Sequence, residues 1–209
     1  MLLTVVDYGV GNLRSIAKSL EKANSENGLK YSIKVTSDIK DIRKSDKLVL
    51  PGQGSFKACK GGIDKIIGLD SELNEGVKNK KKPIFGICAG MQLFATTGYE
   101  DNETKGLNWI PGDVVKLDRK ESELKIPHMG WNEVNAIESP LFKGISNNSD
   151  FYFVHSYHFK TAKENIVAST IYSSEITAAV QKDNIFGTQF HPEKSHNNGQ
   201  LLIKNFIDW

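Results

Sequence analysis

The sequence predicts an α/β fold, with a mostly parallel central sheet flanked by helices and an antiparallel extension in the second half. In the first 95 residues, short apolar runs alternate with segments of helical periodicity, which is typical of a parallel sheet with helices on both faces. After residue 106, short strand-like runs separated by turns favour antiparallel pairing that returns to the main sheet. No repeat, low-complexity tract or linker interrupts the chain, so residues 1–209 are predicted to form a single domain.

Each element is predicted from the spacing of its apolar residues. In Leu13–Ala23 that spacing is helical, whereas Tyr31–Thr36 alternates as a strand does. The predicted strands are Leu2–Val6, Tyr31–Thr36, Lys47–Leu50, Ile84–Ile87, Gly112–Leu117, Trp131–Ala136, Phe151–Phe159, Ile166–Ile171, Ala178–Gln181 and Ile185–Thr188. The predicted helices are Leu13–Ala23, a turn from Asp38 to about Lys44, Phe56–Ile67, Ser71–Lys80 and Gly199–Asp208.

Composition and charge exclude several classes of protein. The chain is 39% apolar and 25% charged, as globular proteins are, and its net charge of +2 is too small to indicate nucleic-acid binding. Its two cysteines do not make a disulfide framework and fit a reducing compartment. The start has no basic segment of a secretion signal, and no run approaches the ~18 apolar residues of a membrane span. We therefore expect a cytoplasmic protein with no nucleic-acid or membrane partner.

Three loops that follow predicted strands are candidates for a site: Asp7–Asn12, Pro51–Ser55 and Gly86–Gln92. Ligands of open α/β sheets bind at the carboxyl ends of the strands, so these loops can converge. The first loop resembles a dinucleotide-binding turn, but Arg14 stands where the third glycine belongs. Nucleotide binding is therefore not predicted.

Cys88 is the candidate nucleophile. An apolar strand leads to it, Gly86 and Gly90 flank it at two residues on each side, and a helical pattern follows. This arrangement predicts a thiol in a tight turn at the start of a helix, where the positive helix end favours an ionised sulfur. The alternative is a small buried core cysteine, which is the commoner fate of a lone cysteine.

His191 and Glu193 are the candidate partners of that thiol. A predicted strand leads into His191, and Glu193 lies two residues further on, so that in an extended chain both side chains project to the same side. A carboxylate there can hold one imidazole nitrogen and leave the other facing a thiol. Each residue alone could be an ordinary surface group, but with Cys88 they predict a catalytic triad.

The glycine loop Pro51–Gly54 is the candidate for an oxyanion site. Glycine lets a backbone N–H come close to a reacting carbonyl, and an N–H of this loop together with that of Ala89 could hold an oxyanion. The loop is also an ordinary strand-to-helix turn, and the two interpretations are compatible.

The remaining cysteine and histidines predict no metal site and no cofactor. Cys59 lies in a helical segment and is expected to be an ordinary packing or surface residue. His155 and His158 are three residues apart in one predicted strand, so we expect them to face opposite ways and to be structural or peripheral. No Cys/His spacing matches a zinc site, and the other histidines are His128 and His196.

Taken together, these motifs resemble a known family. The segments Gly86–Gln92 and Phe190–Glu193 are similar to the class I (triad) glutamine amidotransferases. Two more, Asp7–Asn12 and Pro127–Asn132, resemble the glutaminase subunits of imidazole glycerol phosphate synthase, an enzyme of histidine biosynthesis. The resemblance implies a flavodoxin-like fold formed by one amidotransferase domain over residues 1–209.

The resemblance also implies a chemistry and a set of residues. Cys88 would attack the side-chain amide of glutamine, His191 would carry the proton to departing ammonia, and Glu193 would orient His191, with a thioester intermediate. The ammonia would pass to a cyclase partner, folded as a β/α barrel, in a heterodimer. The implied oxyanion hole is the backbone of Ala89, Gly52 and Gln53. Glutamine would contact Gln92, Glu100, Ser156 and Tyr157, and the partner would contact Asn12, Met129, Trp131 and Lys194.

The chain departs from the family at two positions. Ala89 stands where leucine is common, and Gln53 where valine is common; both contribute backbone to the implied oxyanion hole. Three alternatives stay open at this point: a paralogue that supplies ammonia to a surface-sugar pathway, a non-catalytic regulatory protein, and a thiol peptidase or chaperone of a related fold. Since a transferase that releases ammonia wastes glutamine, we expect low glutaminase activity for the isolated chain.

Overall fold

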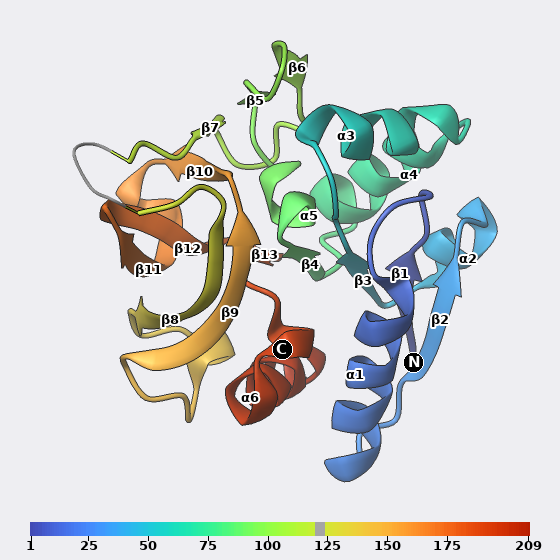
Figure 1. The fold of residues 1–209 in the computed structure, drawn as a ribbon. Coiled ribbons are helices and arrows are strands. Elements are labelled where there is room, and N and C mark those ends of the chain that lie inside the picture. The colour runs from blue at the N-terminus through green and yellow to red at the C-terminus, as the bar shows by residue number, and fades with distance from the viewer. Residues whose placement is uncertain (120–123) are drawn as a thin grey trace.

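The computed structural model describes residues 1–119 and 124–209 and confirms the α/β fold (Figure 1). Within the described residues, a nine-stranded sheet runs through the molecule in the order β2-β1-β3-β4-β13-β12-β11-β8-β9. The first five strands in this order are parallel to one another. The other four continue the sheet in antiparallel pairs. Because β13 pairs with β4, the end of the chain does return to the parallel half, as expected.

The elements of the large sheet and the helices are close to the predicted ranges. The sheet consists of β1 (Leu2–Val6), β2 (Ser32–Thr36), β3 (Lys47–Leu50), β4 (Ile84–Ile87), β8 (His128–Ala136), β9 (Ser149–His155), β11 (Ile166–Tyr172), β12 (Ser174–Lys182) and β13 (Ile185–Thr188). The α-helices are α1 (Leu13–Glu26), α2 (Ile39–Lys44), α3 (Phe56–Lys65), α4 (Leu69–Asn74), α5 (Ala89–Gln92) and α6 (His196–Asp208). Short turns of other helix types are η1 (Glu75–Asn79), η2 (Pro140–Phe142), η3 (Lys163–Asn165) and η4 (Pro192–Lys194).

Two hydrophobic clusters pack against the two faces of the parallel strands. Successive residues of a strand point to opposite faces, and accordingly Val49 of β3 joins one cluster while Leu48 and Leu50 join the other. The first cluster includes side chains of α1 and α6, and the second includes side chains of α3, α4 and α5. Helices therefore cover both faces, which explains why the inner parallel strands β1, β3, β4 and β13 are mostly apolar, whereas the edge strand β2 is not.

One predicted strand is in fact two. The run Phe151–Phe159 is divided at Ser156 between β9, which pairs with β8, and β10 (Tyr157–Thr161), which pairs with β7 (Gly112–Lys116) in a second sheet. This sheet has the order β10-β7-β5-β6, and β5 (Thr97–Gly98) and β6 (Thr104–Lys105) were not predicted because two residues are too short to show a period. The single-strand prediction was wrong because the chain changes sheets without a turn signal.

No helix among the described residues is long and apolar enough to cross a membrane.

Candidate active site

The backbone at Cys88 has a conformation that few residues other than glycine adopt. Cys88 directly follows β4 and has φ 54° and ψ −115°, a strained region that is typical of functional sites. Its N–H donates to the Thr188 carbonyl at 2.7 Å, and its carbonyl accepts from the Gln92 N–H at 3.1 Å. The helix that follows, α5, is a single turn, so fewer peptide dipoles than expected lie behind the sulfur.

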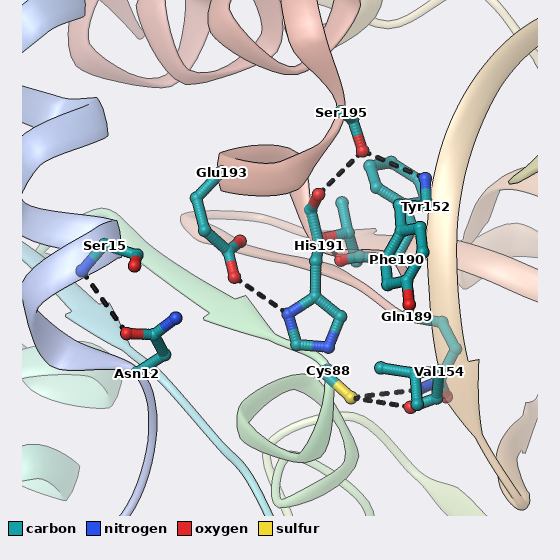
Figure 2. A network of polar contacts seen from close by, with 11 residues as sticks. Asn12, Ser15, Cys88, Tyr152, Val154, Gln189, Phe190, His191, Glu193 and Ser195 are labelled. Carbon is teal, nitrogen blue, oxygen red and sulfur yellow. Dashed lines mark hydrogen bonds and ion pairs between the residues drawn. The ribbon is translucent and has the colours of Figure 1, made fainter. Parts of the chain in front are cut away.

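The three predicted triad residues lie together (Figure 2). The Nδ1 atom of His191 is 2.9 Å from Oε1 of Glu193, and the imidazole lies between this carboxylate and the Cys88 thiol. Both His191 and Glu193 have almost fully buried side chains. The prediction that an extended chain connects His191 and Glu193 was wrong. The turn η4, which begins at Pro192, brings the Glu193 carboxylate to the imidazole.

The charges around His191 favour its protonated form. Burial by itself lowers the pKa of His191, but the charge of Cys88 and a hydrogen bond to it, together with the Glu193 carboxylate, outweigh burial and raise the pKa to about 10. The arrangement therefore places a carboxylate-held imidazole beside the Cys88 thiol, which is the pairing that activates a cysteine nucleophile.

Two residues that the sequence did not single out hold the backbone of the site. Ser195 donates its hydroxyl hydrogen to the His191 carbonyl at 2.6 Å and accepts the Tyr152 N–H at 3.0 Å, while the His191 N–H donates to the Tyr152 carbonyl at 2.9 Å. Tyr8 donates its phenol hydrogen to the Pro51 carbonyl. The contacts Ser195–Tyr152 and Tyr8–Pro51 each join residues that are 43 positions apart, so no local pattern could predict them.

The predicted oxyanion residues Gly52, Gln53 and Ala89 border the same cavity as the thiol. A Cβ atom on Gly52 would lie 2.1 Å from the Gly90 nitrogen, so only glycine permits this close approach of the loop to α5. The Gln53 carbonyl faces Cys59, whose sulfur lies 3.6 Å from it. Burial is the main cause that raises the pKa of Cys59 to about 11, so Cys59 is a thiol that packs, as predicted.

The predicted glutamine-binding residues also line this cavity, which has a volume of about 210 Å³. Glu100 accepts the Phe56 N–H at 2.7 Å, and burial is the main cause that raises the pKa of Glu100. Gln92 donates its amide hydrogens to the Tyr157 carbonyl at 2.9 Å and to Gln189 at 3.0 Å. Ser156 lies at the point where the chain passes from β9 to β10.

The residues expected at the partner interface include two exposed side chains of β8 and one side chain that lines the cavity. Met129 and Trp131 of β8 are 63% and 47% exposed, and Met129 pairs with Val154, which lines the cavity. Lys194 also lines the cavity, with its Nζ 5.5 Å from the centre of the Tyr152 ring. Asn12 accepts the Ser15 N–H at 3.4 Å and thereby caps α1, on the other side of the triad in Figure 2.

Of the two alternatives expected for His155 and His158, structural or peripheral, the structural one is confirmed. Both are buried, because the chain changes sheets between them, and His155 lines the cavity. Nδ1 of His128 lies 2.9 Å from Nε2 of His155. No group of three His, Cys, Asp or Glu side chains in the described part of the chain is arranged to hold a metal ion.

Known proteins resemble this chain in sequence and in fold. Residues 4–209 match the family model "Glutamine amidotransferase class-I". The "Imidazole glycerol phosphate synthase subunit HisH" of Pelagibacter ubique (strain HTCC1062) is 50% identical over 100% of both chains. The protein of the same name from Rhodopseudomonas palustris (strain ATCC BAA-98 / CGA009) is 46% identical over 100% of this chain and 99% of the relative.

Two solved structures that resemble the chain are more distant from it in sequence than these relatives. A crystal structure described as a glutamine amidotransferase superposes with a TM-score of 0.71 at 15% identity, covering 98% of this chain and 97% of the other. The crystal structure of a glutamine amidotransferase from Thermotoga maritima gives a TM-score of 0.62 at 15% identity, covering 92% of this chain and 76% of the other. At these identities the likeness concerns the fold alone.

Proposed function

The chain belongs to the class I glutamine amidotransferases and, within them, to the HisH subunits of imidazole glycerol phosphate synthase, and from this premise we propose how its residues act. Its function is that of a glutaminase subunit, which hydrolyses glutamine to glutamate and ammonia for histidine biosynthesis. The observation that carries the proposed mechanism is the imidazole of His191, which lies between the Glu193 carboxylate and the Cys88 thiol beside a cavity.

In the first half of the proposed reaction, Cys88 becomes acylated. His191 holds the proton of the thiol, and the thiolate attacks the side-chain carbonyl carbon of glutamine, so that an S–C bond forms and the carbonyl becomes an oxyanion. The oxyanion then collapses, the C–N bond breaks, and His191 gives its proton to the departing ammonia. Glu193 keeps the imidazole oriented and stabilises its positive charge.

In the second half, water hydrolyses the γ-glutamyl thioester. His191 takes a proton from the water as it attacks, a second oxyanion forms, and the C–S bond breaks to give glutamate and the free thiolate. We propose that the N–H of Ala89 and a backbone N–H of the Gly52–Gln53 loop stabilise both oxyanions.

The same cavity supplies the groups that would hold the substrate. Glu100 carries a carboxylate that can pair with the α-ammonium group of glutamine. The NH₂ group of Gln92 donates to Tyr157 and Gln189, so its side-chain oxygen remains available to accept a hydrogen bond from the substrate. The backbone at Ser156 and Tyr157 forms another wall of the cavity. These roles follow from the position of the residues beside the thiol.

Since this chain belongs to the subunits of a synthase, it has a partner subunit. We propose that the partner is a barrel-shaped cyclase that forms a heterodimer with this chain. The exposed side chains of Met129 and Trp131 on β8 and of Lys194 at the cavity support this proposal, with Asn12 on the far side of the triad. A partner seated there would receive ammonia before it reaches water. We also infer that residues 1–209 fold as one domain, since both ends of the chain contribute strands to one sheet.

The alternative acceptor, a sugar, is not favoured, because relatives that are 43–50% identical over the full chain bear the name of the synthase. Expression of the gene in a histidine auxotroph that lacks its own glutaminase subunit, together with the matching cyclase, separates the two. Growth without histidine is expected, and failure to grow would contradict the histidine-pathway assignment.

The proposed nucleophile is tested by Cys88→Ala. We expect this variant to lose glutamine hydrolysis completely and to keep its affinity for the partner, because the triad acts on the substrate while the partner contacts other residues. The measurement is glutamate release, with partner binding as the control for folding. Hydrolysis that persists in a preparation free of other glutaminases would rule out Cys88 as the nucleophile.

A further inference from the structure

Gln189 is a fully buried residue beside the thiol that the proposed mechanism does not use. It directly follows β13, and its backbone N–H donates to the Ala178 carbonyl at 2.8 Å. Its side-chain Nε2 lies 3.7 Å from the sulfur of Cys88. In Figure 2, Gln189 and Val154 approach the sulfur from a different side than His191 does.

The neighbours of Gln189 decide which end of its amide faces the sulfur. Gln92 donates to the Tyr157 carbonyl at 2.9 Å, and a carbonyl can only accept, so the NH₂ group of Gln92 must lie there. The same NH₂ group lies 3.0 Å from the side-chain oxygen of Gln189. The nitrogen of Gln189 is consequently the atom that remains for Cys88, and it presents a hydrogen-bond donor to the sulfur.

The Tyr157 carbonyl is itself held by His155, and a second buried histidine, His128, contacts His155. Nδ1 of His155 donates to it at 2.8 Å, so Nε2 of His155 accepts from Nδ1 of His128 at 2.9 Å. Nε2 of His128 then accepts from Nδ2 of Asn132 at 3.2 Å. This sequence of contacts requires both rings to be neutral, and burial, the main cause, does lower the pKa of His128 to about 4 and that of His155 to about 3.

We propose that Gln189 is a positioning residue that donates an N–H to the Cys88 sulfur. The Tyr157 carbonyl, held in place by a buried hydrogen-bond chain from Asn132 through His128 and His155, orients Gln189 through Gln92. The proposal rests on the role of Cys88 as the nucleophile. A donor at this point stabilises the thiolate before attack and holds the sulfur in one direction. Because the hydrogen-bond chain starts on β8, it connects the strand of Met129 and Trp131 with the reacting atom.

The first test replaces the donor. Gln189→Met keeps most of the side-chain volume without an N–H, and Gln189→Glu places an acceptor and a negative charge against the sulfur. We expect kcat to fall about 10- to 100-fold in Gln189→Met, with little change in KM, and further in Gln189→Glu. The rate of alkylation of Cys88 by iodoacetamide, followed by peptide mass mapping, is expected to shift to higher pH in both variants.

A matched control keeps this test specific. Gln181 lies on β12 and accepts a hydrogen bond from Ser139 at 2.8 Å, outside the cavity, so Gln181→Met should leave kcat and the alkylation profile unchanged. If Gln189→Glu does not fold, Gln189→Met still decides the question. An alkylation profile of Gln189→Met that matches the unmodified chain overturns the proposal. Retained hydrolysis in Cys88→Ala would instead contradict the nucleophile, so the two failures are distinguishable.

The second test addresses the chain of hydrogen bonds. His128 stacks on Phe153 and Tyr172, with ring centroids 4.6 and 4.0 Å away, so His128→Phe keeps the stacking but removes both ring nitrogens. We expect this variant to shift the alkylation profile in the same direction as Gln189→Met, and to add nothing when the two are combined. Additive shifts would show that the two residues act separately and would overturn the proposed connection.

Discussion

Cys88 and His191 both occupy environments that are unfavourable for the residue taken alone, one through its backbone conformation and the other through burial. The thiol stands on a backbone with φ 54°, a conformation that a cysteine adopts at a cost of about 1–3 kcal/mol. The imidazole is almost fully buried, yet two acidic neighbours favour its charged form over the loss of hydration. The backbone strain and the burial of the imidazole each reduce stability if taken alone, and both bring a side chain to the cavity.

The protonation of His191 gives a prediction at this scale. Since Cys88 and Glu193 raise its pKa, Cys88→Ser should lower the pKa of His191, and Cys88→Ser with Glu193→Gln should lower it further. The measurement is an NMR titration of the imidazole in each variant. Because the pKa of His191 is higher in the folded than in the unfolded protein, its protonation stabilises the fold. This stabilisation is complete at pH values below the pKa of the unfolded state and is lost as the pH rises through the pKa of the folded state. An unchanged titration in the double variant would contradict the ion pairing.

At the scale of elements, the site depends on loops at the carboxyl ends of parallel strands. β3, β4 and β13 are neighbours, so the loop with Gly52, the turn at Cys88 and the segment of His191 emerge at one edge of the sheet. The carboxyl end of β1 lies at the same edge and brings Tyr8 onto the Pro51 carbonyl. Gly52 allows the Pro51–Gly54 loop to lie this close to α5, because a Cβ atom there would clash with the helix.

The close approach of this loop is tested by Gly52→Ala. Its Cβ would meet the backbone of Ala89 and Gly90, which cannot rotate away, so we expect a loss of about 1–3 kcal/mol in the free energy of unfolding, and lower kcat because the proposed oxyanion donors are displaced. Gly61→Ala is the matched control, since nothing lies near its Cβ in α3, and it should stabilise by about 0.5–1 kcal/mol. Chemical denaturation measures both, and equal effects of the two substitutions would disprove the argument.

At the scale of the whole molecule, the antiparallel half of the sheet brings the proposed docking strand to the cavity. β8 and β9 lie at the end of the sheet, and their outward residues include Met129, Trp131 and Tyr152, close to Val154 at the cavity. Trp131 also stacks on His196 at the start of α6, with ring centroids 4.9 Å apart. An exposed apolar group at this position is suited to a partner surface.

The role of this surface is tested with the cyclase partner. Trp131→Ala should weaken binding to the partner at least tenfold, because exposed tryptophans are frequent anchors of interfaces. Ile67→Ala is the control, since Ile67 is 95% exposed but lies in the loop after α3. Titration calorimetry measures affinity, and glutamine turnover with and without the partner and its ligand measures coupling. Equal turnover in both states would contradict the expectation that the isolated chain is only weakly active.

Local sequence patterns were enough to predict the alternating strands and helices, the glycine loops and the meeting of Cys88, His191 and Glu193. Their information is local: apolar periodicity defines β1, β3 and β4 almost to the residue, and Gly86 and Gly90 mark the turn at Cys88. The family resemblance added the cavity residues Gln92 and Glu100, which do lie beside the thiol.

Only the tertiary structure decided how distant segments meet. Gln189 and Cys88 are 101 residues apart, His128 and His155 are 27 apart, and Tyr8 and Pro51 are 43 apart. The sequence also could not predict that the strand-like run Phe151–Phe159 divides at Ser156 into β9 and β10. A chain that passes from one sheet to another keeps its extended backbone, so its apolar pattern does not change. Periodicity reports which face of an element is buried, whereas the direction of each hydrogen bond depends on the partner that folding places opposite it.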